Sequence, residues 1–248
     1  MVELLVQTQI AAVLIAFARI GTALIFLPGL GEMRIPGRHR LALGLILSLG
    51  LMPAIPVTPP EQTAQLALLL AREALIGLYI GAGARILFAA LQALGAFIAN
   101  VTSLSSALAA GDTGYEGSTA ITSLLTMAGL ALLFATDSHH LMLRGLFLSY
   151  ELIPAGWLPL SDLTGQIARL VARSFYIAAL MGAPFFLLAV VLNLGLGLAN
   201  RVMPSMPVFF VAGPVNIALG LGLLMLASPA ILAWFSDDFA RFFLELRP

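Results

Sequence analysis

Long apolar segments separated by short polar turns dominate the pattern of this chain. The pattern predicts apolar helices over residues 10–27, 41–51, 62–100, 120–135, 141–148, 166–200 and 208–235. Segment 62–100 contains no proline and would be roughly 55 Å long as a helix, whereas the hydrocarbon core of a bilayer measures about 30 Å. We therefore expect an all-α, polytopic membrane protein whose longest helices are not simple spans surrounded by lipid.

The turns between these segments indicate how the chain is oriented. Residues 32–40 form the densest basic loop, and residues 201–207 form a short tip that carries Arg201. Short loops rich in arginine stay in the cytoplasm, so we expect both turns to face it. Residues 236–248 mix acidic residues, arginine and phenylalanine, which predicts an amphipathic tail at the membrane interface. Pro184 is expected to kink segment 166–200.

A polar stretch with regularly placed glycines, residues 101–119, interrupts the apolar helices. It is too polar to face lipid, yet it carries too little charge to be a solvated tail. Within a membrane, irregular backbone is tolerated only where protein or water surrounds it. We therefore expect this central loop to lie in a cavity.

The composition fixes the class and excludes several functions. Sixty per cent of the residues are hydrophobic and 10% are charged, against roughly a quarter charged in soluble domains. The 248 residues suit a single domain. The net charge is zero, so nothing favours nucleic acid, and the absence of cysteine excludes disulfides and thiolate chemistry. All 12 basic residues are arginine, which excludes a Schiff-base lysine.

Several charged residues lie inside or beside the apolar segments, and each would cost about 2.5–3.5 kcal/mol at the centre of a bilayer. They could line the substrate or proton path of a transporter. Alternatively, they could lie near interfaces or pair across subunit contacts. Arginine outnumbers acid here, which favours packing. We assign this structural role to Arg19, Arg72, Glu73, Arg85, Asp137 and Arg144, together with Gly77 and Gly81 on a face of small residues.

Asp137, His139 and His140 suggest a metal site by residue type alone. Neighbouring side chains point in different directions on a helix, however, and His139 has no second histidine one turn later. We expect Asp137 to cap a helix that starts near Ser138, and we expect no metal to bind. A catalytic triad needs residues that converge from separate elements, so we also expect no enzymatic activity.

Taken together in chain order, six stretches resemble the FliR family of flagellar export-gate subunits, whose paralogues serve virulence type III secretion. The stretches are residues 17–21, 27–31, 34–43, the central loop, 133–141 and 208–214. The resemblance covers nearly the whole chain. The central loop departs from the family pattern, because Gly111-Asp112-Thr113 stands where the family often has an Asp-Pro pair.

The resemblance implies an obligate assembly in the bacterial inner membrane, at the flagellar basal body. FliR-like proteins join FliP and FliQ subunits in a helical cone that forms the export channel, with FlhB and FlhA alongside, and unfolded proteins pass through it. It implies long tilted helices, a FliP-like part over residues 1–164, and a FliQ-like hairpin with the amphipathic tail over residues 165–248. Phe209 and Phe210 are expected to pack on other subunits. No cofactor is implied.

The resemblance also places the central loop in the channel, near its constriction. We expect it to act as a plug that folds aside for an unfolded substrate, because its glycines leave the backbone free and its serines tolerate water. The residues of this plug are Ser103, Leu104, Ser105, Ser106, Leu108, Gly111, Asp112, Gly114, Gly117 and Ser118.

A secondary transporter or small-solute channel is the alternative function. The glycine-rich loop and the interruption of segment 208–235 by Gly213 and Pro214 favour it. The absence of a clear internal repeat argues against it, since many transporters are built from repeats.

Overall fold

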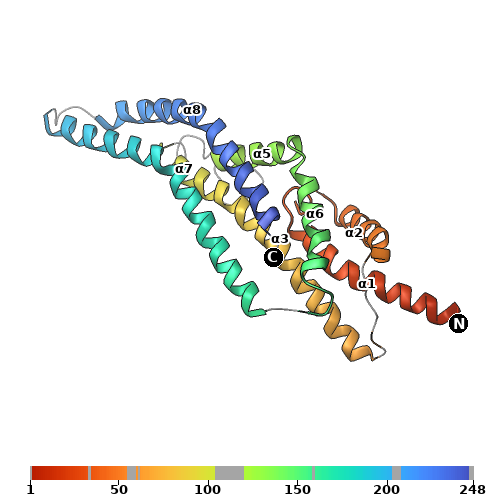
Figure 1. Cartoon of the computed structure of the whole chain (residues 1–248). Coiled ribbons are helices and arrows are strands. Elements are labelled where there is room, and N and C mark those ends of the chain that lie inside the picture. The colour runs from red at the N-terminus through yellow and green to blue at the C-terminus, as the bar shows by residue number, and fades with distance from the viewer. Residues whose placement is uncertain are drawn as a thin grey trace. The chain divides into compact units, whose positions relative to one another are not determined.

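The computed structural model of the chain describes residues 2–32, 35–54, 60, 62–103, 120–157, 160–202 and 208–245. These residues form seven α-helices and one short 3-10 helix, and none of them lies in a strand. The helices are α1 (Val2–Phe26), α2 (Gly37–Leu51), η1 (Met52–Ala54), α3 (Thr63–Val101), α5 (Ala120–Ala135), α6 (Ser138–Leu152), α7 (Leu160–Val202) and α8 (Val208–Glu245) (Figure 1). The predicted all-α class is confirmed.

Every predicted apolar segment forms a helix, but α1, α2, α6, α7 and α8 extend beyond the predicted segments. α5 has the predicted ends, and α3 extends over 39 residues without a break. α6 is longer than predicted because its apolar positions continue as one stripe among polar residues. α7 is continuous through Pro184, and the expected kink at this residue stays a prediction.

Four helices are long and apolar enough to cross a membrane. The segments that qualify are Thr8–Phe26, Thr63–Val101, Asp162–Val202 and Ala212–Leu244. A fifth span is possible if α5 and α6, which meet at an angle of 74°, cross together. In the apolar window of α3, 61% of the residues are buried within the protein, against 17–33% for the other three. α3 is therefore mainly a packing helix, as its length and charges predicted.

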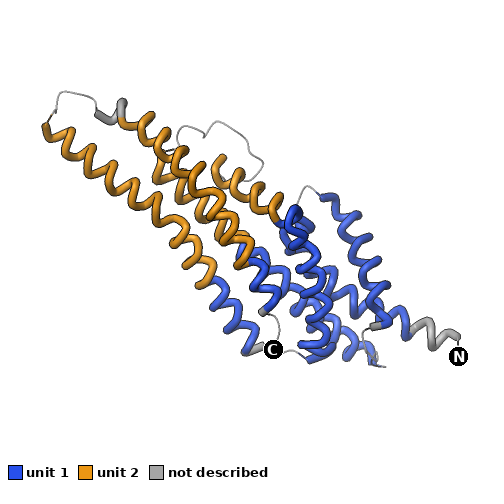
Figure 2. Tube along the Cα trace, turned by 45° about the horizontal axis from the view of Figure 1, so that its top comes forward, with its two compact units in different colours: residues 1–87, 133–171, 239–248 blue, residues 88–132, 172–238 orange. Residues whose placement is uncertain are grey.

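The chain forms two compact units, shown in Figure 2. Unit 1 comprises residues 1–87, 133–171 and 239–248, and unit 2 comprises residues 88–132 and 172–238. α3, α5, α7 and α8 each contribute residues to both units. The predicted division into a FliP-like part, residues 1–164, and a FliQ-like hairpin, residues 165–248, is a different division from these two units. It stays a prediction.

In unit 1, α1 packs closely on the small-residue face of α3. A Cβ added to Gly77 would lie 2.1 Å from the carbonyl oxygen of Arg19, and one added to Gly81 would lie 2.6 Å from that of Ala23. Such a short separation requires glycine, which lets two helix backbones approach closely. The predicted packing face of α3 is therefore occupied by α1 of the same chain.

The C-terminal part of α8 differs from the predicted interfacial tail. The helix continues to Glu245, and Phe239, Phe242 and Phe243 are all buried in unit 1. The ring of Phe242 lies against Gly83, where an added Cβ would be 2.6 Å from it. The interfacial prediction is wrong for these rings, because α3 and α7 offer them a protein surface to pack on.

Unit 2 is built around the antiparallel pair of α7 and α8, which run side by side in Figures 1 and 2. Arg173 on α7 forms an ion pair with Asp238 on α8, with Nε 2.8 Å from Oδ1. Phe88 on α3 meets Phe235 on α8 edge to face at 4.9 Å between ring centroids. Close contacts at Gly95 and Gly220 bring α5 and α8 onto α3.

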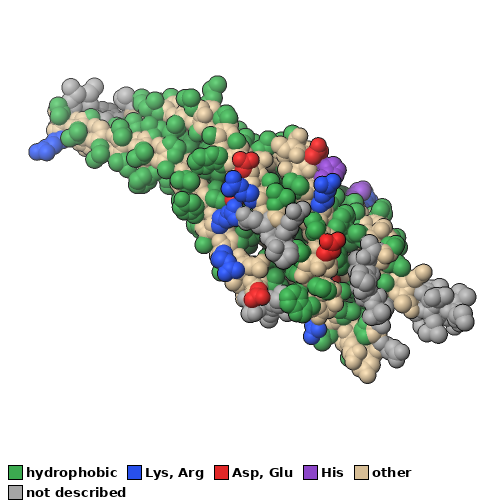
Figure 3. Space-filling view, viewed as in Figure 1, with side chains coloured by type: hydrophobic (Ala, Val, Ile, Leu, Met, Phe, Trp, Pro, Cys, Tyr) green, Lys and Arg blue, Asp and Glu red, His purple; other side chains and the backbone are tan. Residues whose placement is uncertain are grey.

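The outer surface of this hairpin is apolar. Figure 3 shows apolar side chains over most of the visible surface of α7 and α8. The large exposed side chains on the part of α7 in unit 2 include Phe175, Tyr176, Phe186, Leu187, Val191, Leu194 and Leu198. A surface of this kind must be covered by lipid or by protein.

Candidate functional site

Arg19 lies at the centre of a buried polar network in unit 1. Its side chain has no exposed area, and all three of its guanidinium nitrogens donate hydrogen bonds. Nε donates to Oε2 of Glu73 at 2.8 Å, Nη1 to the carbonyl oxygen of Ser149 at 2.9 Å, and Nη2 to that of Ile153 at 3.0 Å. One arginine thus connects α1, α3 and the end of α6.

Glu73 uses its second oxygen to hold the turn that follows α6. Oε1 accepts a hydrogen bond from the backbone N–H of Gly156 at 3.0 Å, and Nη1 of the neighbouring Arg72 donates to the carbonyl oxygen of Gly156 at 3.0 Å. Gly156 has a φ of 87°, a conformation that glycine adopts without strain. The turn of residues 153–157 is therefore fixed to α3.

Tyr150 closes the network from the α6 side. The guanidinium carbon of Arg19 lies 3.9 Å from the centroid of the Tyr150 ring, a cation–π contact. The Tyr150 hydroxyl donates to the carbonyl oxygen of Ala16 at 3.2 Å. The positive charge thus has a carboxylate and an aromatic face as partners, both within the protein.

This network suits a structural role, because its polar atoms already have partners. Both oxygens of Glu73 accept hydrogen bonds, and the Ser149 hydroxyl donates to the Leu146 carbonyl at 2.6 Å. Nε of Arg19 donates to Glu73, and Nη1 and Nη2 donate to backbone carbonyl oxygens. Each of the three nitrogens is therefore already engaged within the protein. For Arg19 and Glu73 the predicted pairing across subunits is wrong, since the two residues pair with each other.

Sequence reasoning missed the partners of this pair on α6. Ser149 is 130 residues from Arg19, and Tyr150 is 134 residues from Ala16. A serine and a tyrosine on an apolar helix carry no signal of a buried arginine. The opposite charges of Arg19 and Glu73 within two apolar segments were the one sign that could have suggested the pair.

The remaining predicted packing residues are distributed over the structure. Arg85 and Arg144 are exposed, so contact with another subunit stays a prediction for both. Gly77 and Gly81 are buried under α1. The side chains of Phe209 and Phe210 lie outside the described residues.

Most of the predicted plug, residues 104–119, also lies outside the described residues. Its first residue, Ser103, has a φ of 58° directly after α3. Nδ2 of Asn216, on α8, donates to Oγ of Ser103 at 3.1 Å. The point where the central loop leaves α3 is thus fixed to α8 within unit 2.

The turn between α5 and α6 corrects one expectation about Asp137. α6 does start at Ser138, and Asp137 occupies the position before it. Its side chain makes no capping hydrogen bond, because Asp137 adopts a left-handed conformation with a φ of 56°. Its carboxylate lies instead 3.6 Å from Nδ1 of His140.

Asp137, His139 and His140 lie closer together than the sequence suggested. Their ligand atoms fall within 4.8 Å of one another, and the two imidazole rings are 4.1 Å apart between centroids. The expectation that the two histidines diverge is wrong, because side-chain torsions bring the rings together although their Cα–Cβ bonds diverge. Asp137 and His140 are both largely exposed. The expectation that no metal binds stays a prediction.

Comparison with known proteins identifies the family. Residues 10–242 match the family described as bacterial export proteins, family 1. The chain is 35% identical over 237 residues to the flagellar biosynthetic protein FliR of Caulobacter vibrioides, with 94% of each chain covered. It is 28% identical over 219 residues to FliR of Escherichia coli, covering 87% of this chain and 84% of the relative.

A virulence-associated relative also matches along most of its length. The chain is 28% identical over 239 residues to the Yop proteins translocation protein T of Yersinia pestis, covering 91% of this chain and 89% of the relative. The FliR resemblance and the predicted function, a subunit of the flagellar type III export gate, are confirmed. With its long apolar helices, the chain is a membrane-embedded component of the flagellar export apparatus and belongs to family 1 of the bacterial export proteins.

Proposed function

We propose that this subunit forms part of the wall of a channel through which unfolded flagellar proteins cross the bacterial inner membrane. Its partners are FliP-like and FliQ-like subunits, with FlhB-like and FlhA-like proteins alongside. Its role is structural and not catalytic. Unit 1 supplies a fixed body held by the Arg19–Glu73 pair, and unit 2 supplies a helical hairpin that contacts neighbours.

The observation that carries this proposal is the open surface of the α7–α8 hairpin. At four of its glycines, Gly195, Gly197, Gly213 and Gly222, an added Cβ would have no atom within 4 Å among the described residues, apart from the backbone of its own helix. Glycine in a helix interior costs about 0.5–1 kcal/mol relative to alanine. Contact with lipid does not require a glycine at these positions. Contact with a helix of another subunit does require small residues where the two backbones approach closely.

The large apolar side chains beside these glycines support the same reading. Met225 and Leu226 on α8 are each 81% exposed, and Val202 at the end of α7 is 78% exposed. Small and large residues side by side offer ridges and grooves to a second helix. We infer that FliP-like and FliQ-like helices cover this surface in the assembled gate.

The transporter alternative finds less support. A solute site inside a membrane needs polar groups that are free to bind the solute. The buried charges of unit 1 are held by each other and by backbone groups. Within the described residues of this unit, the charges expected to mark a path therefore serve packing.

Co-purification tests the proposed assembly. The tagged chain, extracted from membranes in mild detergent, should come out with FliP-like and FliQ-like subunits. Gly195→Leu combined with Gly222→Leu should reduce their recovery while the chain remains folded, because among the described residues no other element comes within 4 Å of a Cβ at either position. Recovery of the native chain alone, or as a homo-oligomer, would refute the proposal.

We further propose that the central loop is the plug of this channel. Its anchorage supports the idea, because the Asn216–Ser103 hydrogen bond fixes one end and α5 starts directly after the other. A loop fixed at both ends can move aside without leaving the site. A gate of this kind is held closed by only a few kcal/mol, so that a substrate can displace it.

A further inference from the structure

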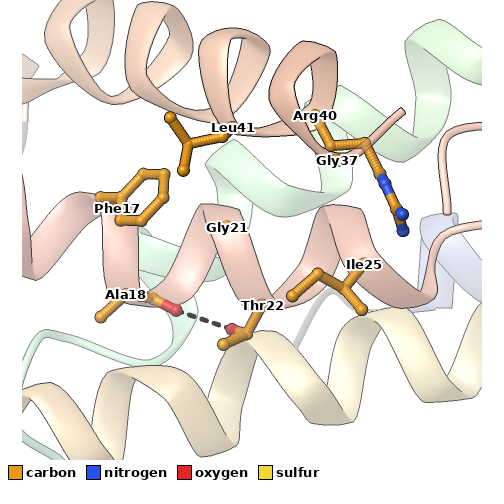
Figure 4. Close-up of a pocket in the computed structure, with 8 residues that line it drawn as sticks. All are labelled: Phe17, Ala18, Gly21, Thr22, Ile25, Gly37, Arg40 and Leu41. Atoms are coloured by element: carbon orange, nitrogen blue, oxygen red, sulfur yellow. Dashed lines mark hydrogen bonds between the residues drawn. The ribbon is translucent and has the colours of Figure 1, made fainter. Parts of the chain in front are cut away.

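A groove in unit 1 between α1 and α2 has no role in the proposals above. It has a volume of about 420 Å³ and is open to the surface along one side. Figure 4 shows Phe17 and Leu41 at one end, Gly21 on α1 in the middle, and Ile25 and Arg40 at the other end. The walls are apolar, and among the described residues Arg40 is the one charged residue that lines the groove.

Arg40 is incompletely paired. Its Nε is buried and has no hydrogen-bond partner in the described part of the chain. Its Nη1 reaches the carbonyl oxygen of Gly31 at 3.3 Å, beyond the usual length. A buried donor without a partner is unfavourable. An anionic oxygen placed at this end of the groove would supply the missing acceptor.

The start of α2 adds positive potential at the same end. α2 has 15 residues, begins at Gly37, and has no side-chain cap on its free backbone N–H groups. Such a helix end favours an anion. Arg38 and His39 precede Arg40 and are exposed, and Glu32 is the only acidic residue from 28 to 40.

The groove thus combines an apolar wall with a cationic end in a protein that lies in a membrane. These two features match the two parts of a phospholipid with a net negative head group. Its acyl chain suits the surface of Phe17, Ile25 and Leu41, and its phosphate suits Arg40. Basic pockets between membrane helices on the cytoplasmic side bind such lipids.

We propose that the α1–α2 groove binds one anionic phospholipid, with the phosphate at Arg40 and an acyl chain along Phe17 and Leu41. The occupied groove joins α2 to α1 and provides the acceptor that Arg40 lacks. A helix of a neighbouring subunit is the competing occupant, and the experiment separates the two.

The test uses the intact export-gate complex in nanodiscs of phosphatidylcholine with a minor fraction of photoreactive phosphatidylglycerol. Labelling should concentrate on α1 and α2. Arg40→Gln, which removes the charge, and Gly21→Leu, which fills the groove next to the Phe17 ring, should each reduce labelling at least about fivefold. Arg85→Gln on α3 and Gly50→Leu are the controls and should retain it, since neither residue lines the groove.

Three results would overturn the proposal. One is equal labelling of native and Arg40→Gln complexes of equal thermal stability. Another is equal labelling when photoreactive phosphatidylcholine replaces phosphatidylglycerol. The third is a crosslink from a photoreactive amino acid at position 41, in place of Leu41, to another subunit and not to lipid. This crosslink would identify a helix of that subunit as the occupant.

Discussion

Arg19 Nε on α1 lies 2.8 Å from Glu73 Oε2 on α3, and neither side chain has any exposed area. The two residues are 54 positions apart in the chain. Either charge alone would strongly destabilise this apolar interior. Each residue compensates the buried charge of the other. The pair therefore determines which faces of the two helices can meet.

We predict that breaking this pair destabilises the subunit severely. Glu73→Ala should lower the free energy of unfolding by about 3–5 kcal/mol, because it leaves a buried arginine without its counter-charge. Arg19→Lys should also be poorly tolerated, since a lysine cannot replace the four directed hydrogen bonds of the guanidinium. Thermal unfolding in detergent and the yield of assembled complex measure both effects.

A double substitution and a surface control complete this test. Arg19→Met with Glu73→Met should be less destabilising than the sum of the two single changes. Arg85→Lys should stay within about 0.5 kcal/mol of the native subunit, because Arg85 is exposed. Strictly additive effects would contradict a direct interaction between the two buried charges.

Replacing glycine by alanine should have opposite effects on stability at Gly77 on α3 and at Gly222 on α8. Gly77→Ala should cost about 1–3 kcal/mol, because its Cβ would lie 2.1 Å from the Arg19 carbonyl and would force α1 away. Gly222→Ala adds a methyl group in open space and should be neutral or stabilising for the isolated subunit. Unfolding of the two purified variants in the same detergent provides the comparison. Equal stability of the two would argue against close packing of α1 on α3.

The topology is open to a direct labelling test. We predict that Gly37 and Ser205 both face the cytoplasm, since short arginine-bearing turns resist translocation. The chain has no cysteine, so Gly37→Cys and Ser205→Cys each introduce one thiol. A membrane-impermeant thiol reagent should label both only after the cytoplasmic side is opened. Labelling of either in cells with only the outer membrane permeabilised would reverse the assignment.

Deletion of residues 109–115 tests the plug. The shortened subunit should still assemble, because both anchors of the loop remain. The membrane should become leaky to ions and small solutes, because the deleted segment no longer fills the channel. Conductance of complexes in planar bilayers measures this change. A normally assembled complex with unchanged conductance would make the loop a passive connector.

The Asp137–His140 turn should bind no metal in the assembled gate. Asp137 and His140 are respectively 78% and 64% exposed, and exposed ligands from neighbouring positions hold an ion weakly compared with a buried, ordered set. Elemental analysis of the purified complex should find no stoichiometric zinc, nickel or copper, and His140→Gln should export normally. Stoichiometric metal that disappears in His140→Gln would show the prediction to be wrong.

The helices could be predicted from sequence because the information is local. The apolar run 120–135 gave α5 its ends, and the uninterrupted run after residue 62 gave α3 its length. The tail after residue 235 was misread for the same reason. Its pattern of phenylalanines and charges fits a membrane interface or a protein core equally well, and only the position of Gly83 opposite Phe242 decides between them.

The candidate site could be predicted only in part. Arg19 and Glu73 stood out because a charge in an apolar segment needs a partner, yet nothing local identifies the partner. Asp137 preceded a helix as expected, but its left-handed backbone removed the predicted cap. Arg40 was one of several basic loop residues, and its unpaired Nε depends on how α2 lies over α1.

By itself the sequence determined that this chain is helical, membrane-embedded and related to FliR, because hydropathy, helix signals and motif order are properties of consecutive residues. Only the tertiary structure decided that Arg19 faces Glu73, that α1 occupies the glycine face of α3, and that the C-terminal phenylalanines are buried. The physical reason is that a buried charge, a glycine face or an aromatic ring requires some partner. Which partner it finds depends on residues far away in the chain that folding brings within a few ångströms.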